Sequence, residues 1–242
     1  MKYALLGGLA AACFPFISVS AVELSQDFSL LGNVGLFSEY NSRGLSQTQR
    51  DPSLQLSLML LHSSGFYVAS WSSNVDFGHG SKASYETDYI GGYLWQPSEK
   101  VTVDVGYLKY TYPKQSNLNV SEKYLTLDAY GFLFGAYYSD DNYGSQASLY
   151  SYVGYKTTLP YDVGVQVKYG RSDFKDPVFF NSDGGSRESY RSWELQLSKA
   201  YVGLNWSASF VGTDLSKTEC SSYMGYEDVC SNRMVFGVSK DF

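Results

Sequence analysis

Apolar and polar residues alternate with a period of two along most of this chain. That is the period of a β-strand, because successive side chains point to opposite faces of a sheet. At 54–60, leucines alternate with Gln55 and Ser57, and at 101–107 valines alternate with polar residues such as Thr102. Segments of this kind recur to the end of the chain and predict about twelve strands, an even number, as single-chain bacterial barrels have.

The connections between these segments are long and short in turn. The long ones lie near residues 46–51, 76–85, 113–121, 140–147, 175–188 and 214–232. The short ones lie near residues 62–65, 96–100, 130–132, 158–162 and 199–202. This sorting is expected when one end of a barrel faces the periplasm and the other the outside. Proline cannot donate to a closed ladder, and beyond residue 21 it occurs in connections or at strand ends. These prolines are Pro52, Pro97, Pro113, Pro160 and Pro177.

The two faces of the predicted strands differ in chemistry. One face carries Leu, Val, Phe, Tyr and Trp, and the other carries Gly, Ser, Asn, Gln and charged residues. Unpaired buried charges are costly, so many charged inward positions favour a wet interior with the apolar face outside. Charged residues make up 17% of the chain and tyrosines number 23, which suits a barrel with aromatic girdles. We therefore predict an all-β fold, a single closed antiparallel transmembrane β-barrel with up-and-down meander order.

The first residues have the form of a secretory signal. Lys2 gives a short positive start, residues 5–17 are apolar, and small residues at 19–21 predict cleavage after Ala21. A lipoprotein signal ending at Cys13 is the alternative, but the apolar run continues past that cysteine. We assign residues 1–21 to a signal peptide and 22–242 to the barrel. No later stretch of about 20 apolar residues occurs that would form a spanning helix.

The chain ends on Phe242. Many outer-membrane barrels end in phenylalanine, which the barrel assembly machinery is understood to read. We therefore expect location in the bacterial outer membrane, with membrane lipid, lipopolysaccharide and the assembly machinery as partners. The sorting of long and short connections predicts the orientation of the barrel. Phe242 lies at the periplasmic end, and the 214–232 loop lies at the outer end.

Several motifs resemble the TorF-type porins of proteobacteria, most specifically over residues 33–112. They are Tyr40-Asn41-Ser42-Arg43-Gly44-Leu45-Ser46-Gln47, Asp51-Pro52-Ser53-Leu54-Gln55, Trp71-Ser72-Ser73-Asn74-Val75-Asp76-Phe77 and the ending Val238-Ser239-Lys240-Asp241-Phe242. Asn41-Ser42 replaces the family's more usual aromatic pair, and the 214–232 loop looks like an individual addition. The resemblance implies an outer-membrane barrel with a porin role. It supplies no substrate and no catalytic residue.

Charged residues on the polar face are the candidates for function. By strand parity they are Glu39, Arg43, Glu86, Asp88, Asp104, Asp128, Lys156, Lys168 and Glu194. Acids exceed bases in this set, and charge in a pore sets ion selectivity, so we expect a weak preference for cations. The same groups could instead pair across the lumen and brace the barrel. About twelve strands lie between a filled and an open interior. The lumen is therefore either a narrow pore for ions and small hydrophilic solutes, or blocked by tyrosines and an inward-folded 175–188 loop.

Other chemistry has little support in the sequence. Cys220 and Cys230 close a short loop in an exported chain, which predicts a disulfide, with a metal site as the sharper alternative. His62 and His79 are the histidines, and neither lies in a recognisable catalytic motif. A net charge of -6 argues against nucleic acid. We predict a passive channel that is not an enzyme and needs no cofactor or metal. The alternatives are a closed structural or adhesion barrel whose loops bind partners and, more remotely, an outer-membrane hydrolase.

Overall fold

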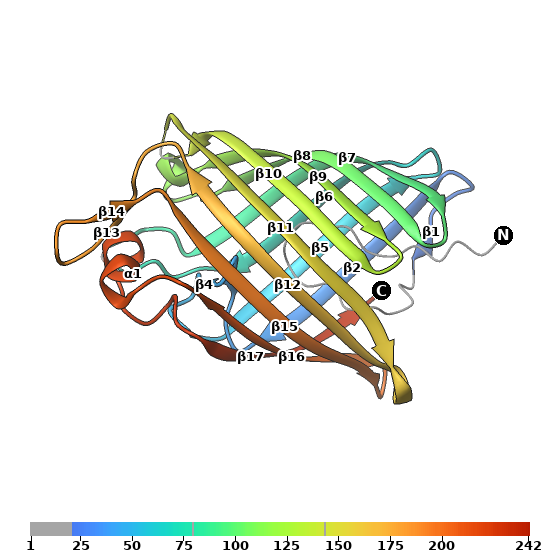
Figure 1. Ribbon diagram of the computed structural model, residues 1–242. Helices are drawn as coiled ribbons and strands as arrows, with labels where there is room; N and C mark the ends of the chain where they lie inside the picture. The colour runs from blue at the N-terminus through green and yellow to red at the C-terminus, as the bar shows by residue number, and fades with distance from the viewer. Residues whose placement is uncertain (1–20, 79, 143) are drawn as a thin grey trace.

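The structure, a computed structural model, describes residues 21–78, 80–142 and 144–242, so the predicted signal segment lies outside the described residues except for Ala21. Within this part of the chain, twelve strands form a closed antiparallel barrel (Figure 1). They are β2 (Phe28–Phe37), β5 (Ser53–His62), β6 (Phe66–Asn74), β7 (Tyr85–Ser98), β8 (Val101–Thr111), β9 (Val120–Ala129), β10 (Phe132–Asn142), β11 (Gln146–Leu159), β12 (Val163–Phe174), β15 (Ser189–Tyr201), β16 (Leu204–Thr213) and β17 (Arg233–Asp241).

Consecutive barrel strands pair with each other, and β2 pairs with both β5 and β17, which closes the sheet. The predicted all-β meander barrel is therefore confirmed. Phe242 lengthens the closing ladder, because its backbone N–H donates to the Gly32 carbonyl at 3.0 Å and its carbonyl accepts from the Gly32 N–H at 2.8 Å.

The remaining elements are short. They are the strands β1 (Val22–Glu23), β3 (Asn41–Ser42), β4 (Leu45–Ser46), β13 (Phe179–Phe180) and β14 (Ser186–Arg187), the 3₁₀ turns η1 (Ser116–Leu118) and η2 (Pro160–Asp162), and the helix α1 (Lys217–Met224). No helix in the described part of the chain is long and apolar enough to cross a membrane.

The connections separate the two ends of the barrel (Figure 1). One end, here called the turn end, carries the tight connections and the C-terminus. The other, the loop end, carries α1 and the β13–β14 hairpin. The prediction of a long connection at residues 140–147 was wrong. Most of this segment is strand, because β10 continues to Asn142, β11 begins at Gln146, and these two residues are paired. The ladder between the two strands extends to its tip, so little free loop remains there.

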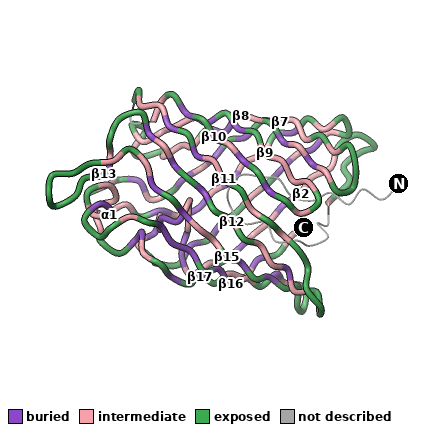
Figure 2. Tube along the Cα trace, in the orientation of Figure 1, coloured by how far each residue is buried: buried purple, intermediate pink, exposed green. Residues whose placement is uncertain are grey.

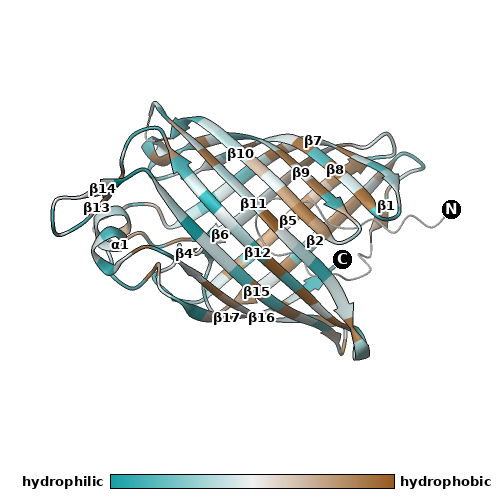
Figure 3. Ribbon diagram, viewed as in Figure 1, coloured by the Kyte–Doolittle hydropathy of each residue, from teal (hydrophilic) through white to brown (hydrophobic). Residues whose placement is uncertain are grey.

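Large apolar side chains cover the outside of the barrel. Leu54, Leu56 and Leu58 on β5 are 46–49% exposed, and the same holds for alternate residues around the wall (Figures 2 and 3). A water-soluble protein rarely exposes so continuous an apolar surface. The alternation that predicted the strands is therefore the alternation between the outside and the inside of one wall.

The prediction that Tyr and Trp belong to the outward, apolar face was wrong on β6 and at Tyr40. Tyr67 and Trp71 point inward and are buried, whereas Phe66 and Val68 face outward at 64% and 60% exposure. Tyr40 also lies inside, because β2 ends at Phe37 and the strand parity stops there. In each case an interior partner accounts for the placement, since Tyr67 bonds an acid and Trp71 packs on the Tyr40 ring at 4.9 Å.

The inner surface of the barrel has two regions of different chemistry. From β5 to β11 it is lined by buried apolar and tyrosine side chains, among them Met59, Leu108 and Tyr137. From β12 to β17 the inward residues are mostly Ser, Gln, Asn and charged groups, such as Gln196 and Ser209. The polar part of the inner surface therefore lies mainly along the second wall.

Candidate functional site

The connection between β2 and β5 folds into the mouth of the barrel at the loop end. Its strands β3 and β4 form a hairpin, here called the inner hairpin, whose two-residue turn is Arg43-Gly44. Both turn residues have positive φ, 51° and 87°, as a type I′ turn requires. The tip lies against β16, because a Cβ on Gly44 would approach Thr213 Cγ2 to 2.6 Å. Glycine at this position lets the hairpin reach the opposite wall.

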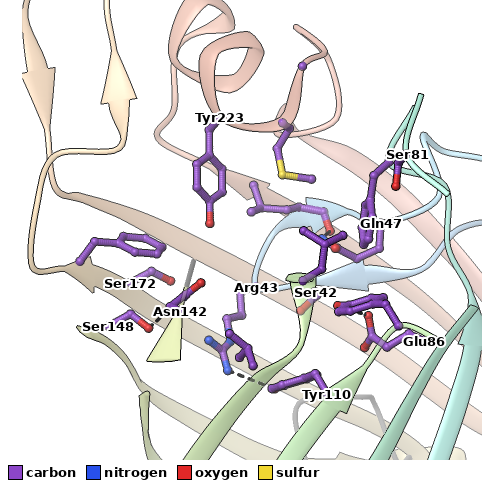
Figure 4. A pocket seen from close by; sticks show the side chains of 18 of the residues that line it. Ser42, Arg43, Gln47, Ser81, Glu86, Tyr110, Asn142, Ser148, Ser172 and Tyr223 are labelled. Carbon is purple, nitrogen blue, oxygen red and sulfur yellow. Dashed lines mark hydrogen bonds between the residues drawn. The ribbon is translucent and has the colours of Figure 1, made fainter. Parts of the chain in front are cut away.

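Arg43 extends from the inner hairpin across the lumen. Its Nη2 donates to Glu122 Oε2 on β9 at 2.6 Å. Its guanidinium lies over the ring of Tyr150 on β11 at 4.5 Å and 5.5 Å from the ring centroid of Tyr137 on β10. Tyr110 also donates its hydroxyl to Glu122, at 2.8 Å. One side chain thus joins the hairpin to β9, β10 and β11 and narrows the mouth. Figure 4 shows its further hydrogen bond to the Tyr110 hydroxyl on β8.

Arg233 on β17 contacts both the base and the turn of the same hairpin. It donates to Glu39 Oε1 at 2.5 Å, to the Gly44 carbonyl at 3.0 Å and to Asn41 Oδ1 at 3.0 Å. The Arg233 and Glu39 side chains are only 6% and 3% exposed. A buried pair of this kind holds its partners in one geometry, since either charge alone would be poorly solvated.

Acids without ion-pair partners gather on β7 and β8. Glu86 accepts from the hydroxyls of Tyr40 and Tyr112, at 2.9 Å and 2.6 Å. Asp88 is 4% exposed, and its Oδ1 has no hydrogen-bond partner among the described residues. Asp104, deeper in the barrel, accepts from Tyr67 at 2.8 Å. In the part of the chain that the structure describes, none of these three carboxylates forms an ion pair.

Two further ion pairs point into the barrel from β9, β11, β12 and β15. Lys156 on β11 pairs with Asp128 on β9, and Lys168 on β12 pairs with Glu194 on β15 at 3.3 Å. These four side chains keep between 12% and 19% of their surface exposed although they point into the barrel. Water therefore reaches them inside the wall.

The structure places all nine predicted charged residues inside the barrel or its mouth, but in separate groups rather than in one ring. Arg43 comes from the inner hairpin and not from a continued strand. Sequence reasoning missed Glu122 and Arg233, although strand parity could have found both. Glu122 is two residues from inward Tyr124, and Arg233 precedes outward Met234.

The histidines and acids form no evident catalytic or metal centre. His62 ends β5, and its Nδ1 accepts from the Ser64 backbone N–H at 3.1 Å and contacts Ser64 Oγ at 2.6 Å, so it caps the turn. His79 lies outside the described residues. Across residues 21–78, 80–142 and 144–242, no group of three or more His, Cys, Asp or Glu side chains is arranged to hold a metal ion.

The helix α1 and its flanking loop form a roof over part of the mouth. Cys220 and Cys230 are joined by a disulfide, as predicted. Ser216 and Glu219 form a capping box at the start of α1, and Arg187 pairs with Glu219 at 2.7 Å. Burial opposes ionisation of Glu219, but hydrogen bonds from Ser216 and the Arg187 charge outweigh it and hold the pKa of this carboxyl below its usual value.

Removing the disulfide is expected to loosen the roof without opening the barrel. Replacing Cys220 and Cys230 by serine releases a loop whose ends are 10 residues apart, with a loss of about 2–3 kcal/mol in local stability. Hydrogen exchange of α1 should accelerate in the variant, while exchange in β8 and β9 stays unchanged. Reductant should reproduce this effect in the natural protein and add nothing in the variant. Equal protection of α1 in both would show that other contacts hold the roof.

The closed meander, its apolar exterior and its charged interior define a barrel of porin-like architecture. A search of solved structures agrees. The chain matches a KdgM porin with a TM-score of 0.50 at 12% identity, over 88% of this chain and 99% of that one. It matches a chain from a study of in-meso crystallisation of membrane proteins with a TM-score of 0.53 at 9% identity, over 88% and 83%. At these identities the likeness concerns the fold alone.

The chain belongs to a family described as bacterial protein of unknown function (Gcw_chp), whose model matches residues 21–242. No curated protein matches the chain.

Proposed function

We propose that this protein is an outer-membrane channel of porin type, passing ions and small hydrophilic solutes through a lumen narrowed at its loop end by the inner hairpin. In this proposal the loop end faces the outside and the turn end faces the periplasm. Transport is passive and uses no cofactor.

The observation that carries the proposal is that two ion pairs inside the barrel stay accessible to solvent, while the outside of the barrel is apolar. Lys156 with Asp128 and Lys168 with Glu194 stay accessible to solvent within the barrel. A soluble barrel would invert this arrangement and bury apolar groups inside. A polar interior behind a lipid-facing surface is the pattern of outer-membrane channels.

The same proposal gives the chain its location and partners. The apolar exterior suits membrane lipid and lipopolysaccharide, and terminal Phe242, set in the β17–β2 ladder, suits recognition by the barrel assembly machinery. The resemblance of residues 33–112 to TorF-type porins supports this reading.

The lumen charges support a weak cation preference. Each basic residue described at this site has an acid partner: Arg43 with Glu122, Lys156 with Asp128, Lys168 with Glu194 and Arg233 with Glu39. Three further acids on one wall, Glu86, Asp88 and Asp104, form no ion pair in the described part of the chain, so acids outnumber bases in the lumen. An excess of acids along a pore favours cations.

Replacing Glu86 by Gln and Asp88 by Asn together is expected to lower the cation-to-anion permeability ratio by about twofold or more. The reversal potential in a salt gradient across a planar bilayer measures this ratio, best at low salt where screening is weak. Glu227→Gln removes one charge from an exposed position on the roof and is the control. Anion selectivity of the unaltered protein would contradict the proposed preference.

A closed barrel with a structural or adhesive role is the second candidate. The observation in its favour is that Leu108 and Val211 are fully buried inside the barrel, so part of the interior is packed. Single-channel recording of the refolded protein separates the two. Discrete conductance steps support the channel, and a silent bilayer with folded protein supports the closed barrel.

A further inference from the structure

A cavity of about 670 Å³ lies at the loop end, between the inner hairpin below and α1 above. Figure 4 shows Arg43 and Ser42 on the hairpin side and Tyr223 pointing down from the helix. The volume falls within the range of about 300–1,000 Å³ typical of small-molecule sites. The cavity is thus large enough for one or two sugar rings.

Two kinds of group line this cavity. Aromatic residues come from the hairpin's flank, the barrel wall and the helix, and among them Tyr112 and Tyr223 are partly exposed while the others are buried: Tyr40, Tyr112, Tyr150, Phe174, Tyr190 and Tyr223. Amides and hydroxyls also line the cavity: Gln47, Gln115, Asn142, Ser148, Ser172 and Ser222. Ring faces offer flat apolar contact, while the amides and hydroxyls fix orientation through directed hydrogen bonds.

The charged groups at the cavity already have partners. Arg43 is paired with Glu122, and both carboxylate oxygens of Glu86 accept from tyrosine hydroxyls. An anionic ligand would lose its hydration here without gaining a free cation, and a cationic ligand would have to displace the tyrosine hydroxyls from both oxygens of Glu86. The lining therefore favours a ligand that is polar and uncharged, with flat C–H faces to lie on aromatic rings.

One wall group lacks a partner. Ser172 on β12 is buried, and its Oγ forms no hydrogen bond with any residue that the structure describes. It lies beside Ser148 and Asn142, across the cavity from Tyr223 (Figure 4). A buried hydroxyl without a partner is costly, and rotation of the Ser172 side chain toward the cavity would let a ligand hydroxyl satisfy it.

The roof of the cavity is held in place before any ligand binds. The disulfide Cys220–Cys230 and the capping box at Ser216 hold α1. Arg50 ties the same loop to the hairpin's connection through Ser231 Oγ at 2.5 Å. A site that is ordered before binding loses less entropy when its ligand arrives.

We propose that this cavity binds an uncharged sugar of one or two rings. Its placement on the outer face rests on the proposed function, but binding itself does not require an open pore. The aromatic rings supply stacking surfaces, and Ser172 with its neighbours supplies hydrogen bonds to ring hydroxyls.

Titration calorimetry tests the proposal on the full chain refolded in a zwitterionic detergent that has no sugar headgroup. Glucose and maltose are the probes, with glucuronate and glucosamine as charged counterparts of glucose that keep its ring. We expect saturable binding of an uncharged sugar, with a dissociation constant on the order of 1 mM or tighter, and weaker binding of both charged probes. Absence of saturation with glucose and maltose, or tighter binding of glucuronate or glucosamine, would overturn the proposal.

Two variants locate the site. Ser172→Ala is expected to weaken binding by about three- to tenfold through loss of one hydrogen bond, and Tyr223→Ala by about tenfold through loss of a ring face. Tyr223→Phe keeps the ring and should bind more tightly than Tyr223→Ala. Tyr201→Ala removes an exposed tyrosine at the turn end and should leave binding unchanged. Equal loss in Tyr201→Ala would contradict the assignment. Conductance is recorded separately, so a conducting barrel that binds no sugar refutes only this inference.

Discussion

Replacing Arg43 by alanine is expected to raise the single-channel conductance by about twofold or more, because the constriction is set by the residues that line the pore. The variant removes the side chain that crosses the lumen to Glu122 and Tyr150. It also frees the inner hairpin from the β9–β11 wall. Glu122 is then left without its partner, so cation preference should increase as well. Recording in planar bilayers at symmetrical salt gives the conductance directly.

Arg50→Ala is the matched control for this variant. Arg50 lies in the same connection and has a positive φ of 69°, close to the 51° of Arg43, so alanine carries a similar backbone strain at both positions. Its side chain bonds the Asp228 carbonyl and Ser231 on the roof and not the lumen wall. Conductance of Arg50→Ala should stay near that of the natural protein.

The outcome that would contradict this view of the constriction is a folded Arg43→Ala barrel with unchanged conductance. Arg43→Lys sharpens the comparison, because lysine keeps the charge but lacks the planar group that stacks on tyrosine. We expect the conductance of Arg43→Lys to lie between that of the natural protein and that of Arg43→Ala. A conductance equal to that of the alanine variant would show that stacking, rather than charge, holds the hairpin.

The fold could be predicted from the sequence because a barrel wall is a single sheet, in which each residue faces either the inside or the outside. Along β8, inward Asp104 is fully buried and the next residue, outward Val105, is 41% exposed, so the alternation in the sequence reports the two sides of the wall directly. The closing pair β2–β17 followed from the even number of strands. Register did not follow, since it depends on which inward residues bond across the sheet.

The faces of β6 could not be read because tyrosine and tryptophan suit either side. Each has an apolar body and a polar tip, so Tyr67 can face lipid or bond Asp104 inside. Inside is favoured here because the Asp104 carboxylate is fully buried and needs a donor. Only the three-dimensional neighbourhood supplies that information.

The sequence did not predict the inner hairpin because its strands are only two residues long, too short to show an alternation of apolar and polar residues. Residues 46–51 were expected to form a simple polar loop, and the 175–188 loop was the segment considered for blocking the lumen. Instead β13 and β14 pair with each other beside α1, and Phe180 donates its backbone N–H to Ser222 Oγ at 3.1 Å. The local signal that existed was Arg43-Gly44, a dipeptide able to form a tight hairpin turn.

Replacing Arg233 by methionine is expected to lower the free energy of unfolding by about 3–5 kcal/mol, the usual cost of leaving one buried charge without its partner. Glu39 would remain in the interior, and its Oε2 already has no partner among the described residues. The Gly44 carbonyl and Asn41 would also lose their donor. Urea unfolding in lipid vesicles, followed by tryptophan fluorescence, measures the change.

The double variant Glu39→Met with Arg233→Met separates a buried pair from general damage to β17. Apolar replacement of both partners removes the stranded charge, so the double variant should be more stable than Arg233→Met alone. Arg171→Met is the control, because its pair with Asp173 is 48% and 36% exposed and should contribute no more than about 1 kcal/mol. If Arg233→Met costs no more than Arg171→Met, the Glu39–Arg233 pair does not anchor the hairpin, and the constriction is held by its other contacts, such as those of Arg43 with Glu122 and of Tyr190 with the Arg43 carbonyl.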